Sequence, residues 1–261
     1  MATLNKYHHG QFSWVDLMAP DTKTAKDFYT SLFDWTYVDF PTDQGGVYTQ
    51  FKSRDLPVAG LGQLPDEMKA AGIPGFWTSY VTVDDADTVA ATATELGGTV
   101  TMPVMDVMTA GRMAFLADLE GAHFAIWQPG EHAGAGLVNE PVSFAWNELL
   151  TKDIDAAKVF YAALFGWEIS TDNNDGIEYY AISNAGRLNG GILPWSSQMG
   201  EVPPNWGVYF SVTDCDGIVA RIGELGGRLI VPPRDVEPGR FAVAADPSGA
   251  VFSVMHLHNP D

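Results

Sequence analysis

The chain has 261 residues, of which 46% are hydrophobic and 12% aromatic, so it can build one large domain or two of ordinary size. Lysine and arginine total 14 against 33 aspartates and glutamates, and the resulting net charge of −19 argues against nucleic acid or an anionic membrane surface as a partner. The sequence has neither an apolar run of roughly 20 residues nor a secretory signal in MATLNKYHHGQ, and its single cysteine is Cys215, so we expect a cytoplasmic protein.

The first part of the chain is predicted to form a strand, a helix and three further strands. Residues 12–17 alternate with the period of two that is typical of a strand. Asp21 suits a helix N-cap, and apolar residues recur at helical spacing over residues 25–33. Short strands are then expected at residues 35–40, 47–52 and 58–63. The order is that of a βαβββ unit.

The next part of the chain repeats this order. We expect a strand at residues 76–83 and a helix at 84–96, which the pair Gly97-Gly98 would end as a C-cap. Strands are expected near residues 99–103, 112–117 and 122–128. The first half of the chain therefore contains two βαβββ units.

The whole arrangement occurs twice. AKDFYTSLFDW at residues 25–35 returns as AKVFYAALFGW at 157–167, an offset of 132 that also pairs Tyr48 with Tyr180. Farther along, GRMAF at 111–115 returns as GRFAV at 239–243, an offset of 128. PGEHAGAGLVNEP at 129–141 separates the copies, so we place two modules at residues 1–135 and 136–261. The predicted fold is α+β: four βαβββ units forming two curved mixed sheets with helices on the outer face.

This pattern resembles the vicinal oxygen chelate superfamily, which includes glyoxalases, bleomycin-resistance proteins and extradiol dioxygenases. The F-Y-x-x-L-F-x-W helix end in each copy carries the resemblance, with the turns DLEG at 118–121 and DPSG at 246–249. It spans roughly residues 10–256 and is strongest to two-module actinobacterial proteins labelled glyoxalase-like or hydroxylase, among them a mycobacterial culture-filtrate antigen. It implies a cleft on the concave face of each sheet, whereas the superfamily's activities range from lyases to drug binding.

The resemblance also implies where a divalent metal would be held: on the first strand, on the strand that opens the second unit, and on the last strand. Indole, methyl and glycine cannot coordinate a metal, and the hydroxyls of Thr78 and Ser253 are poor ligands. We therefore predict no metal ligand and no other cofactor. His123 is the remaining candidate, because alternation places it on the cleft face, although a lone histidine in an apolar strand is more often a hydrogen-bonded core residue. The vacant positions are Trp14, Thr78 and Ala125 in the first module and Trp146, Gly207 and Ser253 in the second.

Two carboxylates are the candidate catalytic residues. Asp16 shares a strand face with Trp14, and Glu148 shares one with Trp146, which gives each cleft an aromatic floor with one acid. Burial of such a carboxyl raises its pKa toward the range of a general acid or base.

Other side chains are predicted to bind a ligand beside these acids. Arg112 and Arg240 recur at equivalent positions and would neutralise Asp16 and Glu148, either in a site or as structural ion pairs. Tyr80 and Tyr209 would orient a ligand oxygen or serve as core. The predicted substrate-binding residues are Trp14, Tyr80, Arg112, His123, Trp146, Tyr209 and Arg240.

Three functions remain open on these grounds. The first is a metal-independent enzyme or binding protein whose two clefts hold an aromatic or moderately apolar small molecule. The second is a metal-dependent lyase, oxygenase or hydroxylase of the glyoxalase and dioxygenase type. The third is a non-catalytic interaction protein with vestigial clefts. A monomer and a homodimer are both compatible with the sequence, because two modules in one chain can complete each other's clefts.

Overall fold

A computed structural model describes residues 6–42, 45–172 and 178–258. The first module forms both predicted βαβββ units, with a short helix between them that the sequence did not indicate and a sixth strand that runs past residue 103. Its elements are β1 (Phe12–Ala19), α1 (Thr22–Phe33), β2 (Thr36–Pro41), β3 (Val47–Ser53), β4 (Leu56–Gln63), α2 (Asp66–Ala70), β5 (Phe76–Thr82), α3 (Ala86–Glu95), β6 (Thr99–Val107), β7 (Gly111–Ala117) and β8 (His123–Pro129).

The second module repeats the order of the first, with a single 3-10 turn where the first has α2. Its elements are β9 (Phe144–Thr151), α4 (Ile154–Phe165), β10 (Glu168–Thr171), β11 (Tyr180–Asn184), β12 (Arg187–Pro194), η1 (Ser197–Met199), β13 (Asn205–Ser211), α5 (Cys215–Glu224), β14 (Arg228–Val236), β15 (Gly239–Ala245) and β16 (Val251–Leu257).

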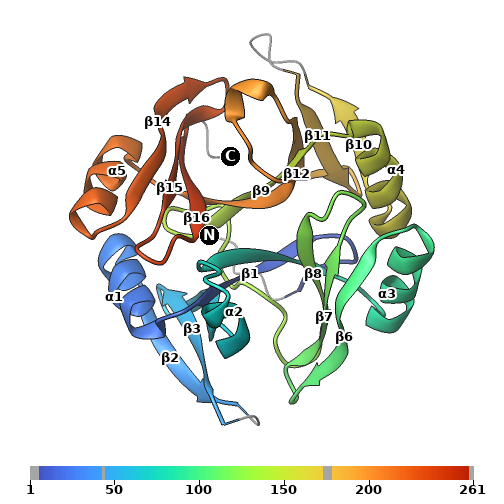
Figure 1. Ribbon diagram of the computed structural model, residues 1–261, viewed down its shortest axis with the longest axis horizontal. Helices are drawn as coiled ribbons and strands as arrows, with labels where there is room; N and C mark the ends of the chain where they lie inside the picture. The colour runs from blue at the N-terminus through green and yellow to red at the C-terminus, as the bar shows by residue number, and fades with distance from the viewer. Residues whose placement is uncertain (1–5, 43–44, 173–177, 259–261) are drawn as a thin grey trace.

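Each module builds one mixed eight-stranded sheet, and the two strand orders are equivalent: β2-β3-β4-β1-β5-β8-β7-β6 and β10-β11-β12-β9-β13-β16-β15-β14. Figure 1 shows the two modules as two halves of the molecule, with the four long helices at the periphery. The tandem α+β architecture is therefore confirmed. Within the described residues, no helix is both long and apolar enough to cross a bilayer.

The predicted helix boundaries have identifiable causes. The Asp21 carboxylate accepts hydrogen bonds from the backbone N–H groups of Lys23 at 2.9 Å and Thr24 at 3.2 Å, so α1 begins where an N-cap was expected. α3 ends at the predicted glycine pair: Gly97 has a φ of +91°, and the Gly98 N–H reaches back to the Ala93 carbonyl at 2.8 Å.

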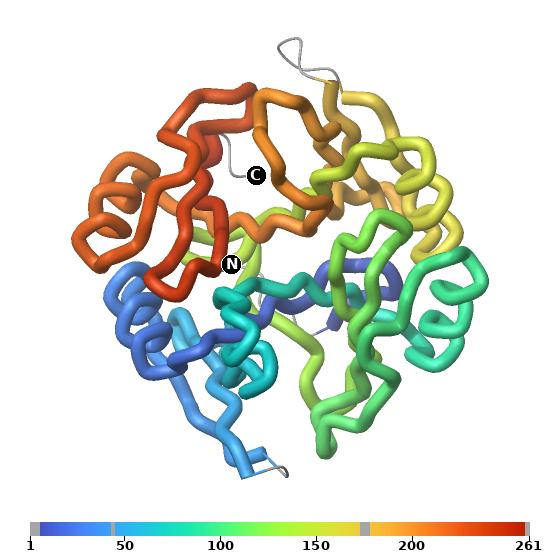
Figure 2. The backbone as a smooth tube through the Cα atoms, in the orientation of Figure 1, coloured from blue at the N-terminus to red at the C-terminus, as the bar shows by residue number. Residues whose placement is uncertain are grey.

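The last turn of each module reaches across to the other module. Asp118 of the DLEG turn accepts a hydrogen bond from the Tyr161 hydroxyl at 2.9 Å, and Asp246 of the DPSG turn accepts one from Tyr29 at 3.1 Å. These contacts bring α4 beside α3 and α1 beside α5, as the tube in Figure 2 also shows. The aspartate of each turn signature is thus explained by its hydrogen bond across the interface between the modules, which we call the joint.

A continuous aromatic core fills that joint. The ring centroid of Phe210 lies 5.1 Å from that of Trp77, 5.4 Å from that of Phe33 and 5.6 Å from that of Trp35. Trp77 also donates its indole N–H to Tyr29 at 3.0 Å, and Trp206 donates to Tyr161 at 2.9 Å. Both tryptophans are therefore packing residues of the core under the helices.

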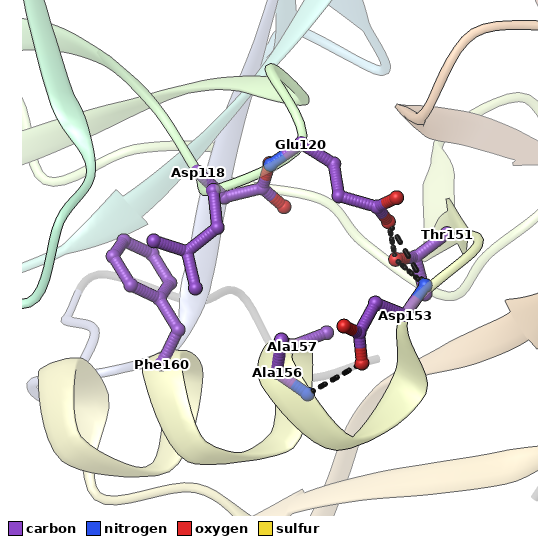
Figure 3. Close-up of a pocket in the computed structure, with 8 residues that line it drawn as sticks. Asp118, Glu120, Thr151, Asp153, Ala156, Ala157 and Phe160 are labelled. Atoms are coloured by element: carbon purple, nitrogen blue, oxygen red, sulfur yellow. Dashed lines mark hydrogen bonds between the residues drawn. The ribbon is translucent and has the colours of Figure 1, made fainter.

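A small cavity lies at the same joint, between the DLEG turn and the start of α4 (Figure 3). The Glu120 carboxylate closes it by accepting the backbone N–H groups of Lys152 at 2.8 Å and Asp153 at 3.1 Å, together with the Thr151 hydroxyl. It has room for about one water molecule. We assign it to the joint and not to ligand binding.

Candidate functional site

Each sheet has a helix-side face in the shared core and an opposite face, which we call the inner face. In β1, Val15 and Leu17 are fully buried on the helix side, so Trp14 and Asp16 lie on the inner face, as alternation predicted. The first inner face comprises Trp14, Asp16, Tyr80, Met113 and Phe115, and the second comprises Trp146, Glu148, Tyr209, Arg234 and Phe241.

On the first inner face, two neutral donors hydrogen-bond the Asp16 carboxylate. Its Oδ1 accepts the Trp14 indole N–H at 2.7 Å and the Tyr48 hydroxyl at 2.7 Å. Tyr80 on β5 pairs in register with Trp14, and its hydroxyl lies 4.0 Å from the Met113 sulfur. Asp16 and Tyr80, both predicted site residues, therefore lie on the same inner face.

The second inner face repeats the motif with different contacts. The Tyr209 hydroxyl donates to Glu148 Oε1 at 2.7 Å, and Tyr179 also hydrogen-bonds this carboxylate. Trp146 donates its indole N–H to the Tyr179 oxygen at 2.9 Å, whereas Trp14 in the first module donates to the acid directly. Glu148 consequently has no indole donor of its own.

The two acids have perturbed protonation. Burial raises the pKa of the Asp16 carboxyl above its ordinary value, although the polar groups of Tyr48, Tyr80 and Trp14 oppose the shift. Burial likewise raises the pKa of Glu148, opposed by hydrogen bonds from Tyr209 and Tyr179 and by the charge of Arg234. The predicted direction of both shifts agrees with the structure.

One glycine in each module makes room for the tyrosine beside the acid. A Cβ on Gly60 would collide with Asp16 Oδ1 and the Tyr48 hydroxyl, and one on Gly191 would collide with the Tyr179 hydroxyl. These glycines pair in register with Asp16 and Glu148 respectively. Glycine is thus required by the space that the hydrogen-bonded tyrosine occupies.

The predicted equivalence of Tyr48 and Tyr180 is wrong, because the partner of Glu148 is Tyr179. The offset between the modules is 131 at Gly60 and Gly191, one less than in the first strand and helix. Tyr180 instead bonds Glu178 and lies under the Lys158 ammonium group, which is 3.6 Å from its ring centroid.

The prediction that Arg112 and Arg240 form ion pairs with the inner-face acids is also wrong, whereas their role in ligand binding stays a prediction that their position does not favour. Arg112 binds Asp87 of α3 at 2.5 Å and Asp106 at 3.0 Å, and Arg240 makes the equivalent bonds to the helix α5 and to β14. Both guanidinium groups lie on the helix side, because residues 112 and 240 alternate with the inner-face residues Met113 and Phe241.

The predicted aromatic floor is present on the second face only. Trp14 is 3% exposed, because the linker residue His132 packs against it with ring centroids 4.6 Å apart. Trp146 remains half-buried, as does Glu148 beside it. Trp14 therefore packs against the linker and donates a hydrogen bond to Asp16, and its role as a ligand contact stays a prediction.

His123 is neither a core histidine nor part of a cluster. It is the first residue of β8 and is exposed to solvent, although its pairing with Ala117 keeps it on the strand face that alternation predicted. An exposed imidazole at a strand end has little to hold a ligand in place. The expectation of a hydrogen-bonded core residue is wrong for this position.

The donors on the inner faces do not fit a three-ligand metal centre. Asp16 lies opposite Thr78, and Glu148 lies opposite Gly207, so each face offers one carboxylate. Nowhere in the described part of the chain do three His, Cys, Asp or Glu side chains gather closely enough to share an ion. One oxygen of each acid already accepts hydrogen bonds: Asp16 Oδ1 from an indole and a phenol, and Glu148 Oε1 from a phenol.

Three inner-face residues were missed by the sequence analysis. Tyr179 was obscured by the one-residue change in offset, for which Gly191 was the available signal. Arg234 has no basic counterpart in the first module, where Met105 takes its place in the pairing with β7. The position of His132 depends on the path of the linker, for which the local sequence contains no signal.

Comparison with known proteins agrees with this architecture. The sequence model of the Glyoxalase/Bleomycin resistance protein/Dioxygenase superfamily matches residues 11–126, and that of the Glyoxalase-like domain matches residues 146–255. The chain is 41% identical to CFP32 of Mycobacterium tuberculosis, which is named as a candidate glyoxylase, over 98% of both chains. It is 36% identical to the anthracycline biosynthesis protein DnrV of Streptomyces peucetius, over 97% of this chain and 96% of that one.

Solved structures share the fold at low sequence identity. A Mn(II)-bound glyoxalase from Novosphingobium aromaticivorans superimposes with a TM-score of 0.64 and 16% identity, covering 95% of this chain and 82% of that one. The 2,3-dioxygenase LapB from Pseudomonas sp. KL28 gives a TM-score of 0.62 and 14% identity, covering 96% and 93%. At these identities the likeness concerns the arrangement of strands and helices.

Proposed function

This chain belongs to the glyoxalase, bleomycin resistance protein and dioxygenase superfamily, and from that premise we propose that it binds a small aromatic metabolite on an inner face without using a metal. The observation that carries the proposal is Glu148: a half-buried carboxyl with a raised pKa, beside the half-buried indole of Trp146. Few polar groups set among aromatic rings are the usual composition of a small-molecule site.

The relatives support the aromatic class of ligand. DnrV is named for anthracycline biosynthesis, and anthracyclines are fused-ring aromatic compounds. The second inner face offers the half-buried ring of Trp146, and the buried rings of Tyr209 and Phe241 line the same face, a composition that suits a planar ligand. A hydroxyl on such a ligand would find Glu148 as its hydrogen-bond partner.

The chemistry available to the chain's own residues is proton transfer. Glu148 can accept a proton from a ligand O–H or C–H group when it is ionised and can donate one when it is protonated, because its raised pKa brings it closer to neutral pH. Tyr209 fixes the position of the carboxyl through its 2.7 Å hydrogen bond. These groups would support an isomerisation or an elimination as readily as simple binding.

A thermal-shift screen of hydroxylated naphthalenes, anthraquinones and flavonoids tests the proposal. A ligand that binds only the native state raises Tm, and the stabilisation grows with the logarithm of the ratio of ligand concentration to Kd. We expect shifts from fused-ring aromatics that Trp146→Ala removes. A screen that gives no shift would support the alternative of an interaction protein with vestigial clefts.

Metal analysis tests the alternative of a metal-dependent lyase or oxygenase. We expect less than roughly 0.1 equivalent of Mn, Fe, Ni or Zn per chain after dialysis, because each inner face supplies a single carboxylate where about three ligands are needed. A stoichiometric metal that Glu148→Gln removes would favour the metal-dependent alternative instead.

A further inference from the structure

The two inner faces differ in access. On the first, the linker covers the indole of Trp14: the His132 ring centroid lies 4.6 Å from that of Trp14 and 5.9 Å from that of Trp127. The Trp127 indole N–H donates to the His132 carbonyl at 2.8 Å, which fixes the linker there. On the second face, Trp146 is half-buried. A ligand can therefore reach the indole of the second module and not that of the first.

The two faces also differ in charge. Arg234 on β14 lies over the Phe241 ring, with its guanidinium carbon 4.7 Å from the ring centroid. The Phe241 ring is 6.3 Å from that of Tyr209, whose hydroxyl donates to Glu148. A row of contacts thus leads from the exposed Arg234 to the half-buried Glu148. In the first module, Met105 occupies the position of Arg234 and pairs with Met113.

The guanidinium of Arg234 is available to a ligand. Three other arginines, Arg112, Arg221 and Arg240, each form a salt bridge with a carboxylate at 3.0 Å or less. Across the described residues, Arg234 has no carboxylate within salt-bridge distance, although the charge of Glu148 acts on it from farther away. Arg187 and Arg228 also lack a carboxylate at that distance in the described part of the chain, and of these three arginines Arg234 is the one that lies over an aromatic ring.

Resting on the proposed function, we infer that the second inner face is the single ligand site of the chain and that Arg234 makes it selective for aromatic carboxylic acids. A planar guanidinium binds a carboxylate through two parallel hydrogen bonds, and the Phe241 ring beneath it holds that plane in position. The aromatic part of the ligand would then lie against Trp146 and Tyr209.

Calorimetric titration with a matched pair of probes tests this inference. The probes are 2-naphthoate and the neutral 2-naphthalenemethanol, and the proteins are the wild type, Arg234→Met and Arg240→Met. We expect the wild type to bind one naphthoate per chain, about tenfold more tightly than the alcohol, as one charge-assisted bidentate contact predicts. Arg234→Met, which copies the residue of the first module, would weaken naphthoate binding about tenfold and leave the alcohol unchanged. Arg240→Met removes a helix-side guanidinium and would change neither affinity.

Each other outcome has a distinct meaning. Equal affinities of the wild type for both probes, a preference for naphthoate that survives Arg234→Met, or two naphthoates per chain would overturn the inference while leaving aromatic binding in place. No binding of either probe by any of the folded proteins would count against the proposed function itself, and the inference would fall with it. Circular dichroism of each variant confirms that it is folded.

Discussion

The imidazole of His132 stands edge-on against the indole of Trp14, with the ring planes 84° apart and the centroids 4.6 Å apart. Two backbone hydrogen bonds anchor this stretch of the linker: Ala135 N–H to the Ser13 carbonyl and Gly136 N–H to the Pro57 carbonyl, both at 2.8 Å. The linker therefore completes the first module as a covered structure. The duplicated acid and indole therefore differ between the modules: Asp16 and Trp14 are buried, whereas Glu148 and Trp146 are half-buried.

Replacement of the two equivalent tryptophans should separate their roles. We expect Trp14→Ala to lower the free energy of unfolding by about 3–5 kcal/mol, because it leaves a cavity under the linker and removes a donor to Asp16. Trp146→Ala should cost less, because its indole is half-buried. Urea denaturation measures both, and equal losses would show that Trp146 is packed as firmly as Trp14.

The buried acid of the first module predicts a pH dependence of stability. Because the pKa of Asp16 is raised in the folded state, its contribution is greatest below the unfolded pKa of 3.8 and is lost as the pH rises through the folded pKa. Asp16→Asn removes this dependence, so the variant should gain stability relative to wild type as the pH rises. Unfolding free energies measured from pH 4 to pH 8 that run parallel for the two proteins would contradict this.

His132 predicts a dependence of opposite sign. Burial lowers its pKa from 6.5 to about 4, so its contribution is complete above pH 6.5 and is lost as the pH falls toward 4. His132→Phe keeps an aromatic ring against Trp14 and gives up no hydrogen bond at the buried Nε2 atom, which has no partner in the described structure. We expect the variant to match wild type at pH 8 and to exceed its stability by up to about 3 kcal/mol at pH 4. If the free energy of unfolding falls equally for the two proteins between pH 8 and pH 4, the imidazole is exposed to solvent in the folded state and the prediction is wrong.

The joint between the modules can be tested at its two tyrosines. Tyr161→Phe leaves the Asp118 carboxylate and the Trp206 indole without their shared partner, and Tyr29→Phe does the same on the other side. We expect each variant to lose about 1–3 kcal/mol of unfolding free energy. Tyr37→Phe, which alters a hydroxyl on an exposed ring, serves as the control and should have no measurable effect.

The fold could be predicted from the sequence because it depends on features that repeat. The helix N-cap at Asp21, the Gly97-Gly98 ending and the alternation in the first strand of each module are local signals, and the duplication presented each of them twice. At these positions the local sequence signals favour the same structure as the overall fold, so the elements can be predicted from the sequence. The short helix α2 and the full length of β6 have no such duplicated signal.

The candidate site was predictable in part. Alternation placed Asp16 and Glu148 on the inner faces correctly, because the period of a strand determines which face a side chain occupies. The ion-pair predictions failed because Asp87 and Asp216, on the helices, lie closer to Arg112 and Arg240 than any inner-face acid. Which carboxylate pairs with an arginine depends on which elements pack together and cannot be predicted from the spacing of residues within one strand.

The most direct test of the account follows the indole N–H signals of Trp14 and Trp146 by NMR during titration with 2-naphthoate. If the second inner face is the ligand site, the Trp146 signal shifts in a saturable way. The Trp14 signal does not shift, because His132 covers that indole. A saturable shift at Trp14 with none at Trp146, or binding that perturbs neither signal, would contradict the account.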